Sequence, residues 1–196
     1  MKNRFFPLFA YLLNRVGKVT GIASIAATSI AVCHNKRMRR NRVFRGFANG
    51  FKLHLVVNEK GEILSFLMNP GNLADSTVVD QLTKTLHGKL FEDKGYSPQT
   101  LSTHLIERGL QLLTTLRSNR KQKLMHLHDK RLLRYRAMIE TVNDQLKNIS
   151  QIEPTLNRSV SNFLVHLLAA LAASLHQKKK PSLNLDGNDN QLLLVA

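Results

Sequence analysis

Hydrophobic and polar positions alternate most clearly between residues 51 and 57, and residues 62–68 repeat the apolar run after a turn of composition Asn-Glu-Lys-Gly. An alternating run, a turn and a second apolar run are together typical of a β-hairpin. The stretch 20–33 is rich in β-branched and small residues, which indicates a buried strand before the hairpin. Residues 20–68 are therefore predicted to form the first three strands of a sheet.

Five other stretches have the apolar spacing, capping residues or terminators that are typical of helices. These predicted helices are 5–17, 75–86, 98–108, 130–149 and 159–176. In the second of them, Asp75 or Ser76 is the expected N-cap. The short segment 89–92 and the mostly apolar run 110–116 predict two further strands between helices. This order of elements predicts an α/β fold with a mixed sheet flanked by helices.

The predicted helix 130–149 has charged residues on one side and apolar residues on another. Arg136, Glu140 and Lys147 fall four and then seven residues apart, which places them on one stripe of a helix. Such a stripe can hold a metal beside a phosphate, or it can be an exposed face with ion pairs, and spacing alone favours the second interpretation. The residues expected to face the core are Met138, Ile139, Val142 and Leu146.

The positive net charge of the chain indicates which kind of molecule it binds. The chain has 196 residues and a formal net charge of +16, and no acidic residue precedes Glu59. Basic runs at 36–42, 117–123 and 178–180 together indicate a polyanionic partner such as nucleic acid. The low aromatic content of 6% and the absence of Trp favour contacts with phosphates over base stacking.

The single cysteine, Cys33, excludes an intramolecular disulfide, and a reducing compartment, the cytoplasm, is expected. The amino-terminal segment 1–13 has the composition of a signal peptide but no small-residue cleavage site follows it. The apolar runs 19–33 and 160–175 are shorter than the roughly 20 residues that span a bilayer. No association with a membrane is expected.

A tight turn, Asp93-Lys94-Gly95-Tyr96, follows the predicted strand 89–92, so that a carboxylate lies at the carboxyl end of a strand. Together with Arg136, Glu140 and Lys147, this turn resembles the signature of the DDE transposases of bacterial insertion sequences. The similarity covers nearly the whole chain, including residues 28–35, 50–55 and 70–72.

The resemblance implies a ribonuclease-H-like fold and two-metal phosphoryl transfer with Mg²⁺ or Mn²⁺ in DNA transposition. Asp93 matches the second catalytic and metal-binding acid of the family, and Glu140 matches the third. Double-stranded DNA, as element ends and target, is the implied partner, and a homo-oligomer is a further expectation. The cations expected to bind DNA are Lys36, Arg37, Arg39, Arg40, Arg42, Lys94, Arg117, Arg120, Lys121, Arg136 and Lys147.

The first acid of the family is missing, because Ala26 stands at its position. Leu133 also replaces the usual Tyr, and the loop before the hairpin is cut to residues 46–49. Two carboxylates leave two divalent ions under-coordinated, so hydrolysis and strand transfer are expected to be impaired. The expected organisation is a remnant of an amino-terminal helical region at 1–18, the transposase DDE domain at 19–176 and a polar flexible tail at 177–196.

Three alternatives remain open at this point. The chain can be a non-enzymatic DNA-binding transposase fragment, which the missing acid favours. It can be a ribosome- or RNA-associated basic protein, since the charge is equally suitable. His126 and His128 with Asp129 form a weaker candidate metal site, because a two-residue spacing on a helix does not converge.

Overall fold

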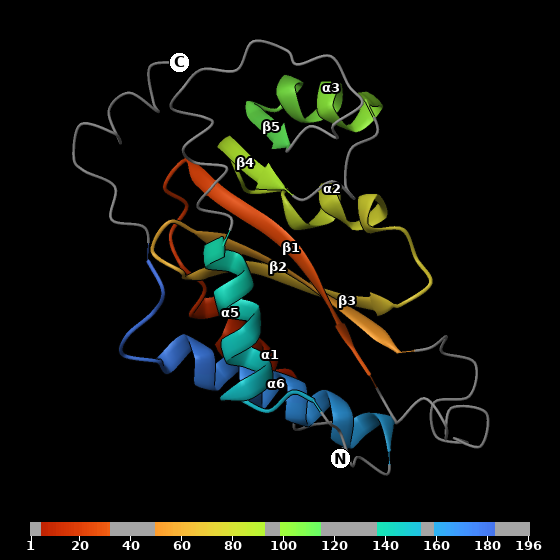
Figure 1. Cartoon of the computed structure of the whole chain (residues 1–196), viewed down its shortest axis with the longest axis vertical. Helices are drawn as coiled ribbons and strands as arrows, with labels where there is room; N and C mark the ends of the chain where they lie inside the picture. Colours follow the sequence, from red (N-terminus) through yellow and green to blue (C-terminus); the bar gives the residue numbers. More distant parts are fainter. Residues whose placement is uncertain (1–4, 32–49, 93–98, 115–136, 154–158, 183–196) are drawn as a thin grey trace.

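The computed structural model describes residues 5–31, 50–92, 99–114, 137–153 and 159–182. Within these residues the chain forms a five-stranded mixed sheet with the order β3-β2-β1-β4-β5 (Figure 1). The strands are β1 (Ile22–Ile30), β2 (Phe51–Asn58), β3 (Ile63–Pro70), β4 (Gly88–Glu92) and β5 (Leu110–Thr114).

The central strand β1 pairs antiparallel with β2 and parallel with β4, and β5 continues the parallel side. The hairpin predicted at 51–68 is confirmed by the antiparallel pairing of β2 and β3, which contains a bulge at Val56 and Val57. Both faces of β1 are covered, which explains why this strand consists of apolar and small polar residues that are mostly buried on both faces, with no strict alternation.

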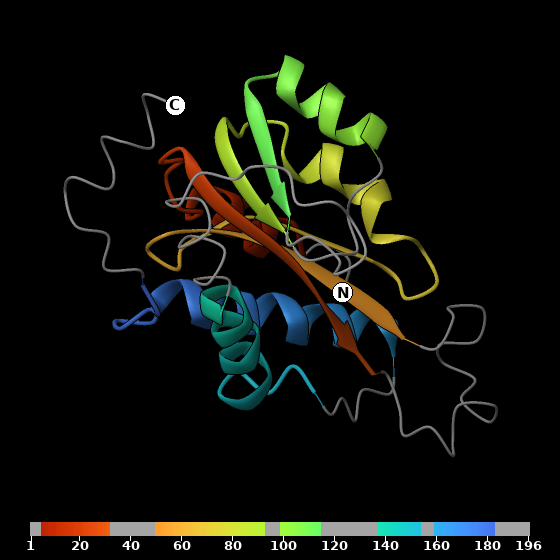
Figure 2. The same ribbon diagram turned by 45° about the horizontal axis from the view of Figure 1, so that its top comes forward.

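Helices cover both faces of the sheet, as Figures 1 and 2 show. One face carries α1 (Phe5–Asn14), α5 (Ala137–Asn148) and α6 (Val160–His176), whose apolar residues share a core with β2. The other face carries α2 (Val79–Leu82) and α3 (Gln99–Glu107), which pack with a second apolar cluster. The predicted α/β class is therefore confirmed. No helix of the described residues is long and apolar enough to cross a membrane.

Local capping determines where α6 starts. The side chain of Ser159 accepts a hydrogen bond from the backbone N–H of Asn162 at 3.1 Å, which satisfies a free donor of the first turn. Phe163 follows and stacks on Phe51 of β2 with ring centroids 5.1 Å apart. The last predicted helix is thus confirmed, and it is attached to the sheet at its first turn.

The helix predicted at 75–86 is wrong in its length and in its cap. A 3-10 turn, η3 (Asp75–Val78), precedes α2, which ends at Leu82, and Ala74 occupies the N-cap without a side-chain hydrogen bond. The Asp75 carboxylate instead pairs with Lys52 of β2 at 2.8 Å. At the C-cap of α2, the hydroxyl and the backbone N–H of Thr83 both donate to the carbonyl of Val79, at 2.8 and 3.0 Å.

Candidate functional site

Ala26 lies in the middle of the central strand, immediately after the last residue of β1 that pairs with β4. That last pair joins Ile25 to Glu92, whose side chain is fully buried. Asp93 is the next residue in the sequence and lies outside the described residues. The side chain of Ala26 packs against the apolar cluster that α5 shares with β2. The position that the family resemblance assigns to the first acid is therefore at the centre of the sheet, on the face that α5 covers.

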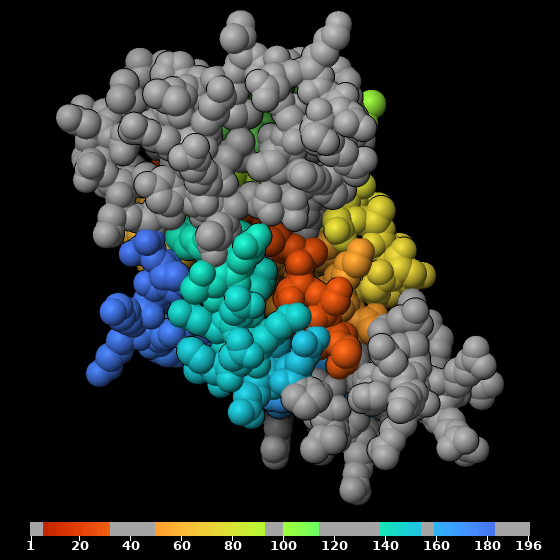
Figure 3. Space-filling view, viewed as in Figure 1, coloured from red at the N-terminus to blue at the C-terminus, as the bar shows by residue number. Residues whose placement is uncertain are grey.

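Glu140 lies in the first turn of α5 and is exposed. The helix is fixed beneath it, because all four residues predicted to face the core are buried: Met138, Ile139, Val142 and Leu146. This confirms the predicted apolar side of the helix. The surfaces of α5, in teal, and β1, in orange-red, lie side by side in Figure 3. Glu140 therefore projects from a helix that packs on the strand of Ala26.

Lys147 lies near the other end of α5, about 10 Å along the axis from Glu140 at a rise of about 1.5 Å per residue. Its ammonium group pairs with Oε2 of Glu153 at 3.4 Å. Oε1 of Glu153 accepts a hydrogen bond from the backbone N–H of Ala31 at 2.8 Å, just beyond β1. Lys147 thus helps to connect α5 with the end of β1, and its role in DNA binding stays a prediction.

The other predicted site residues lie outside the described residues, so their positions stay predictions. They are Asp93 and the cations Lys36, Arg37, Arg39, Arg40, Arg42, Lys94, Arg117, Arg120, Lys121 and Arg136. His126, His128 and Asp129 of the weaker metal site also lie outside them.

The described residues do not fit a two-metal centre. Hard divalent cations need several oxygen ligands, and a pair of such ions needs several carboxylates. The methyl group of Ala26 offers no ligand, and no group of three or more His, Cys, Asp or Glu side chains in the described part of the chain could hold a metal. The described residues alone therefore lack the donor set for two divalent ions.

Comparison with known families decides the identity of this domain. Residues 16–160 match the family described as transposase DDE domain. The chain belongs to this family. The DDE resemblance read from the turn at Asp93 and from the stripe on α5 is thereby confirmed at the level of the family.

The fold of this DDE domain is also found among solved structures. The synaptic complex of the piggyBac transposase with hairpin DNA superposes with a TM-score of 0.57 and 9% identity, over 84% of this chain and 48% of that chain. The predicted ribonuclease-H-like α/β fold is confirmed, and the DDE domain spans about half the length of that structure.

A second solved structure is more distant. It is an intasome of simian T-cell lymphotropic virus in complex with the PP2A regulatory subunit B56 gamma, with a TM-score of 0.41 and 11% identity over 86% of this chain and 59% of that chain. No curated protein sequence matches the DDE domain.

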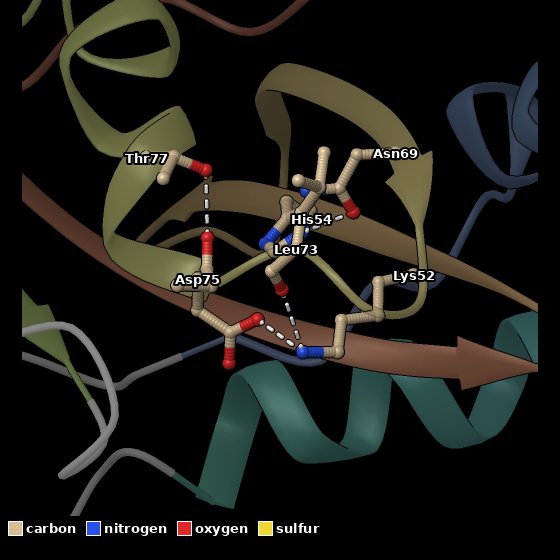
Figure 4. Close-up of polar contacts among 7 residues, drawn as sticks. Lys52, His54, Asn69, Leu73, Asp75 and Thr77 are labelled. Atoms are coloured by element: carbon tan, nitrogen blue, oxygen red, sulfur yellow. Dashed lines mark hydrogen bonds and ion pairs between the residues drawn. The ribbon is translucent and has the colours of Figure 1, made fainter. Parts of the chain in front are cut away.

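On the other face of the sheet, a polar network lies between β2, β3 and residues 73–75, where η3 begins (Figure 4). Nε2 of His54 lies 3.0 Å from Oδ1 of Asn69, to which it donates as the Nε2–H tautomer. Lys52 donates to Asp75 at 2.8 Å and to the carbonyl of Leu73 at 3.2 Å. The sequence indicated the alternation of this strand, but it gave no role to these side chains.

Burial lowers the pKa of His54 below its usual range; the hydrogen bond with Asn69 and the charge of Asp75 oppose this effect, and Lys52 adds to it. The folded DDE domain therefore binds this proton more weakly than the unfolded chain does. Stability contributed by neutral His54 is present above the ordinary pKa of about 6.5 and is lost as the pH falls below it.

When the pH is lowered from about 7.5 to about 5.5, we expect the urea concentration at the unfolding midpoint of the unaltered chain to decrease. We expect a smaller decrease for His54→Gln. The Gln side chain cannot titrate, and its amide group can still donate a hydrogen bond. The comparison of the two midpoints removes the contribution of other titrating groups. An equal fall in both proteins would show that His54 is not responsible.

Proposed function

We propose that this chain is an insertion-sequence transposase acting in DNA transposition, and that its metal-dependent phosphodiester hydrolysis and strand transfer are impaired. Membership of the transposase DDE domain family supports the first part. The observation that carries the second part is the location of Ala26, which follows the last β1–β4 pair at the centre of the sheet.

The location matters because β1 and β4 are parallel neighbours, so residues in the same register lie side by side. If the β1–β4 pairing continued for one more step, residue 26 would lie opposite Asp93. An acid at position 26 would then approach Asp93 on one side and α5, which carries Glu140, on the other. With Ala26 in this place, the proposed cluster keeps two of its three carboxylates, so it lacks both ligands and negative charge for divalent ions.

The proposed partner is double-stranded DNA. The net charge of +16 favours a polyanion, and the similar piggyBac structure is a complex with hairpin DNA. The low aromatic content supports contacts with the phosphate backbone. Assembly of two or more copies on DNA is part of the same proposal.

A second candidate function is a non-enzymatic DNA-binding transposase fragment. The same Ala26 supports it, since binding to phosphates needs no acidic cluster. The two candidates differ in whether the remaining carboxylates support any cleavage.

The experiment combines two measurements on the purified full chain: binding to duplex DNA over a range of salt concentrations, and nicking of supercoiled plasmid with Mn²⁺. We expect salt-sensitive binding, with nicking close to background. Nicking that Glu140→Gln abolishes would contradict the impairment. A preference for RNA over duplex DNA would instead favour the RNA-associated protein.

A further inference from the structure

Three segments that are distant in the sequence meet at the turn between β2 and β3. The backbone N–H of Gly17, after α1, donates to the carbonyl of Ile63 at 2.8 Å. On the other side of the turn, a Cβ atom added at Gly61 would lie only 2.0 Å from the carbonyl oxygen of Pro181, in the segment after α6. The linker from α1 to β1, the hairpin turn and the segment after α6 are therefore in direct contact (Figure 1).

Buried Asn58 fixes two of these segments to each other. Its Oδ1 accepts hydrogen bonds from the backbone N–H groups of Lys60 and Glu62, at 3.0 and 2.9 Å. Its Nδ2 donates to the carbonyl of Lys18 at 3.2 Å and to the carboxylate of Glu62 at 2.8 Å. The backbones of Lys18 and Lys60 are thus held by one side chain.

Aromatic stacking fixes the end of α1 against the end of α6. The ring of Tyr11 stacks on His176 with centroids 5.8 Å apart, and the hydroxyl of Tyr11 is hydrogen-bonded to Nε2 of the same residue. The guanidinium carbon of Arg15 lies 5.8 Å from the centroid of the Tyr11 ring. This stack brings Arg15 close to the segment that begins at Gln177.

The result is a cluster of cations that we name the hairpin corner. Five of its six side chains are exposed and the sixth is half-buried. In the described part of the chain, none of the six takes part in an ion pair. Side chains of the segment after α6, in blue, project at the left edge of Figure 3. The hairpin corner consists of Arg15, Lys18, Lys60, Lys178, Lys179 and Lys180.

Two carboxylates at this turn offset part of the positive charge, but within the residues that the structure describes neither forms an ion pair with one of the six cations. Glu59 is buried and accepts a hydrogen bond from the hydroxyl of Thr20, and Glu62 accepts one from Asn58. Lysines after a helix also interact favourably with its carboxyl-terminal dipole, which explains residues 178–180 without any ligand. The dipole of α6 does not explain why Arg15, Lys18 and Lys60, from two other segments, lie beside them.

We propose that the hairpin corner binds the phosphate backbone of double-stranded DNA, separately from the candidate acidic site. The inference rests on the proposed association with DNA and is independent of catalysis. The six cations outnumber the two carboxylates at the turn, so their mutual repulsion is only partly offset, and a polyanion reduces this cost. A duplex is favoured over single strands because Tyr11 already stacks on His176 and offers no free platform for a base.

The hairpin corner and the candidate acidic site are separated by less than one turn of DNA. Asn58 is three residues along β2 from Leu55, which pairs with Ala26, so the two places are about 10 Å apart along the strand. One turn of DNA is about 34 Å long, which exceeds this separation. The length of a bound duplex therefore does not prevent it from reaching both places.

The test measures how binding of the full chain to duplex DNA depends on salt. The corner variant carries Lys18→Gln, Lys60→Gln and Lys179→Gln, one change in each segment at an exposed position without an ion pair. Each lost phosphate contact lowers the slope of log K against log[salt] by about 0.9, so we expect a reduction by about 2 to 3. We also expect affinity at low salt to fall by at least about tenfold.

A matched pair of single variants controls for net charge. Lys60→Gln and Lys84→Gln remove one charge each from exposed positions, but Lys84 follows α2 on the other face of the sheet. We expect the first to lower the slope and the second to leave it unchanged. Circular dichroism and the urea midpoint should be the same for all variants, because none of the altered side chains is buried.

Three results of these binding measurements would contradict the proposal in different ways. An unchanged slope and affinity in the corner variant, with salt-sensitive binding by the unaltered chain, would overturn the hairpin corner and leave the DNA association standing. Absence of duplex binding by the unaltered chain would overturn both. Corner-dependent binding that is tighter to RNA or to phosphatidylserine vesicles than to duplex DNA would overturn the choice of partner.

Discussion

Ala26→Asp is expected to give the chain Mn²⁺-dependent nicking activity on supercoiled plasmid, where the unaltered chain nicks at close to the background rate. The new carboxylate would project from the centre of the sheet, on the side covered by α5, and immediately after the last β1–β4 pair. It would add the ligand and the negative charge that the candidate cluster lacks. Removal of one member of a catalytic set costs several orders of magnitude, so we expect a gain on the order of 100-fold or more.

The same substitution should alter stability in a way that does not depend on activity. Ala26 packs against apolar residues of α5 and β2, and a carboxylate at this place would be partly desolvated near other acids. We expect Ala26→Asp to lower the melting temperature in the absence of divalent ions. Mn²⁺ should restore it, because an ion that binds the folded chain stabilises it by mass action.

Two variants serve as controls for this gain. Ala26→Asn has nearly the shape of the Asp variant without its charge, and Ala26→Asp with Glu140→Gln lacks the third acid. Neither should nick plasmid. Nicking by the Asn variant would show that a carboxylate at position 26 is not the missing element. Ala26→Asp could also fail to nick plasmid and gain no stability with Mn²⁺. This result would show that restoring a carboxylate at position 26 does not restore the metal site, and it would point to the other differences from the family pattern, such as Leu133 and the short loop 46–49.

Gly88→Ala is expected to reduce the free energy of unfolding by about 3 kcal/mol or more. Gly88 has a φ of +88°, and an added Cβ would lie 2.2 Å from the carbonyl oxygen of Gly21. That carbonyl accepts a hydrogen bond from Lys89 at 2.8 Å, where β4 starts beside β1. Since the obstructing atoms belong to the backbone, the start of the β1–β4 pair must move. Urea unfolding measures the loss.

Gly109→Ala is the matched control, because Gly109 has a similar φ of +76° but nothing within 4 Å of an added Cβ. This variant bears the backbone strain alone, so we expect a loss of about 1 kcal/mol. Equal losses at the two glycines would show that contact with Gly21 adds nothing.

Local patterns in the sequence were enough to predict most elements. Period-two alternation located the hairpin of β2 and β3, and the spacing of Met138, Ile139, Val142 and Leu146 identified the buried side of α5. These predictions succeeded because a strand or an amphipathic helix places residues on one face by its own geometry. The absence of an acid at position 26 is also readable in the sequence, since it depends on the family pattern alone.

The prediction of a helix at 75–86 failed for a long-range reason. Asp75 is a good N-cap residue, and a local argument assigns it to that role. In the folded chain, Lys52 of β2 pairs with its carboxylate, and only short helical turns form before β4. An ion pair between residues far apart in the sequence cannot be read from local spacing.

Composition and short spacing were sufficient to identify the class of fold, the resemblance of Asp93 and Glu140 to a family signature, and the excess of positive charge. The folded chain was needed to show that Ala26 follows the β1–β4 pair on the face of α5, that Lys147 pairs with Glu153, and that three separate segments meet at the hairpin corner. Strand order and burial bring together residues whose separation along the chain has no fixed relation to their distance in space.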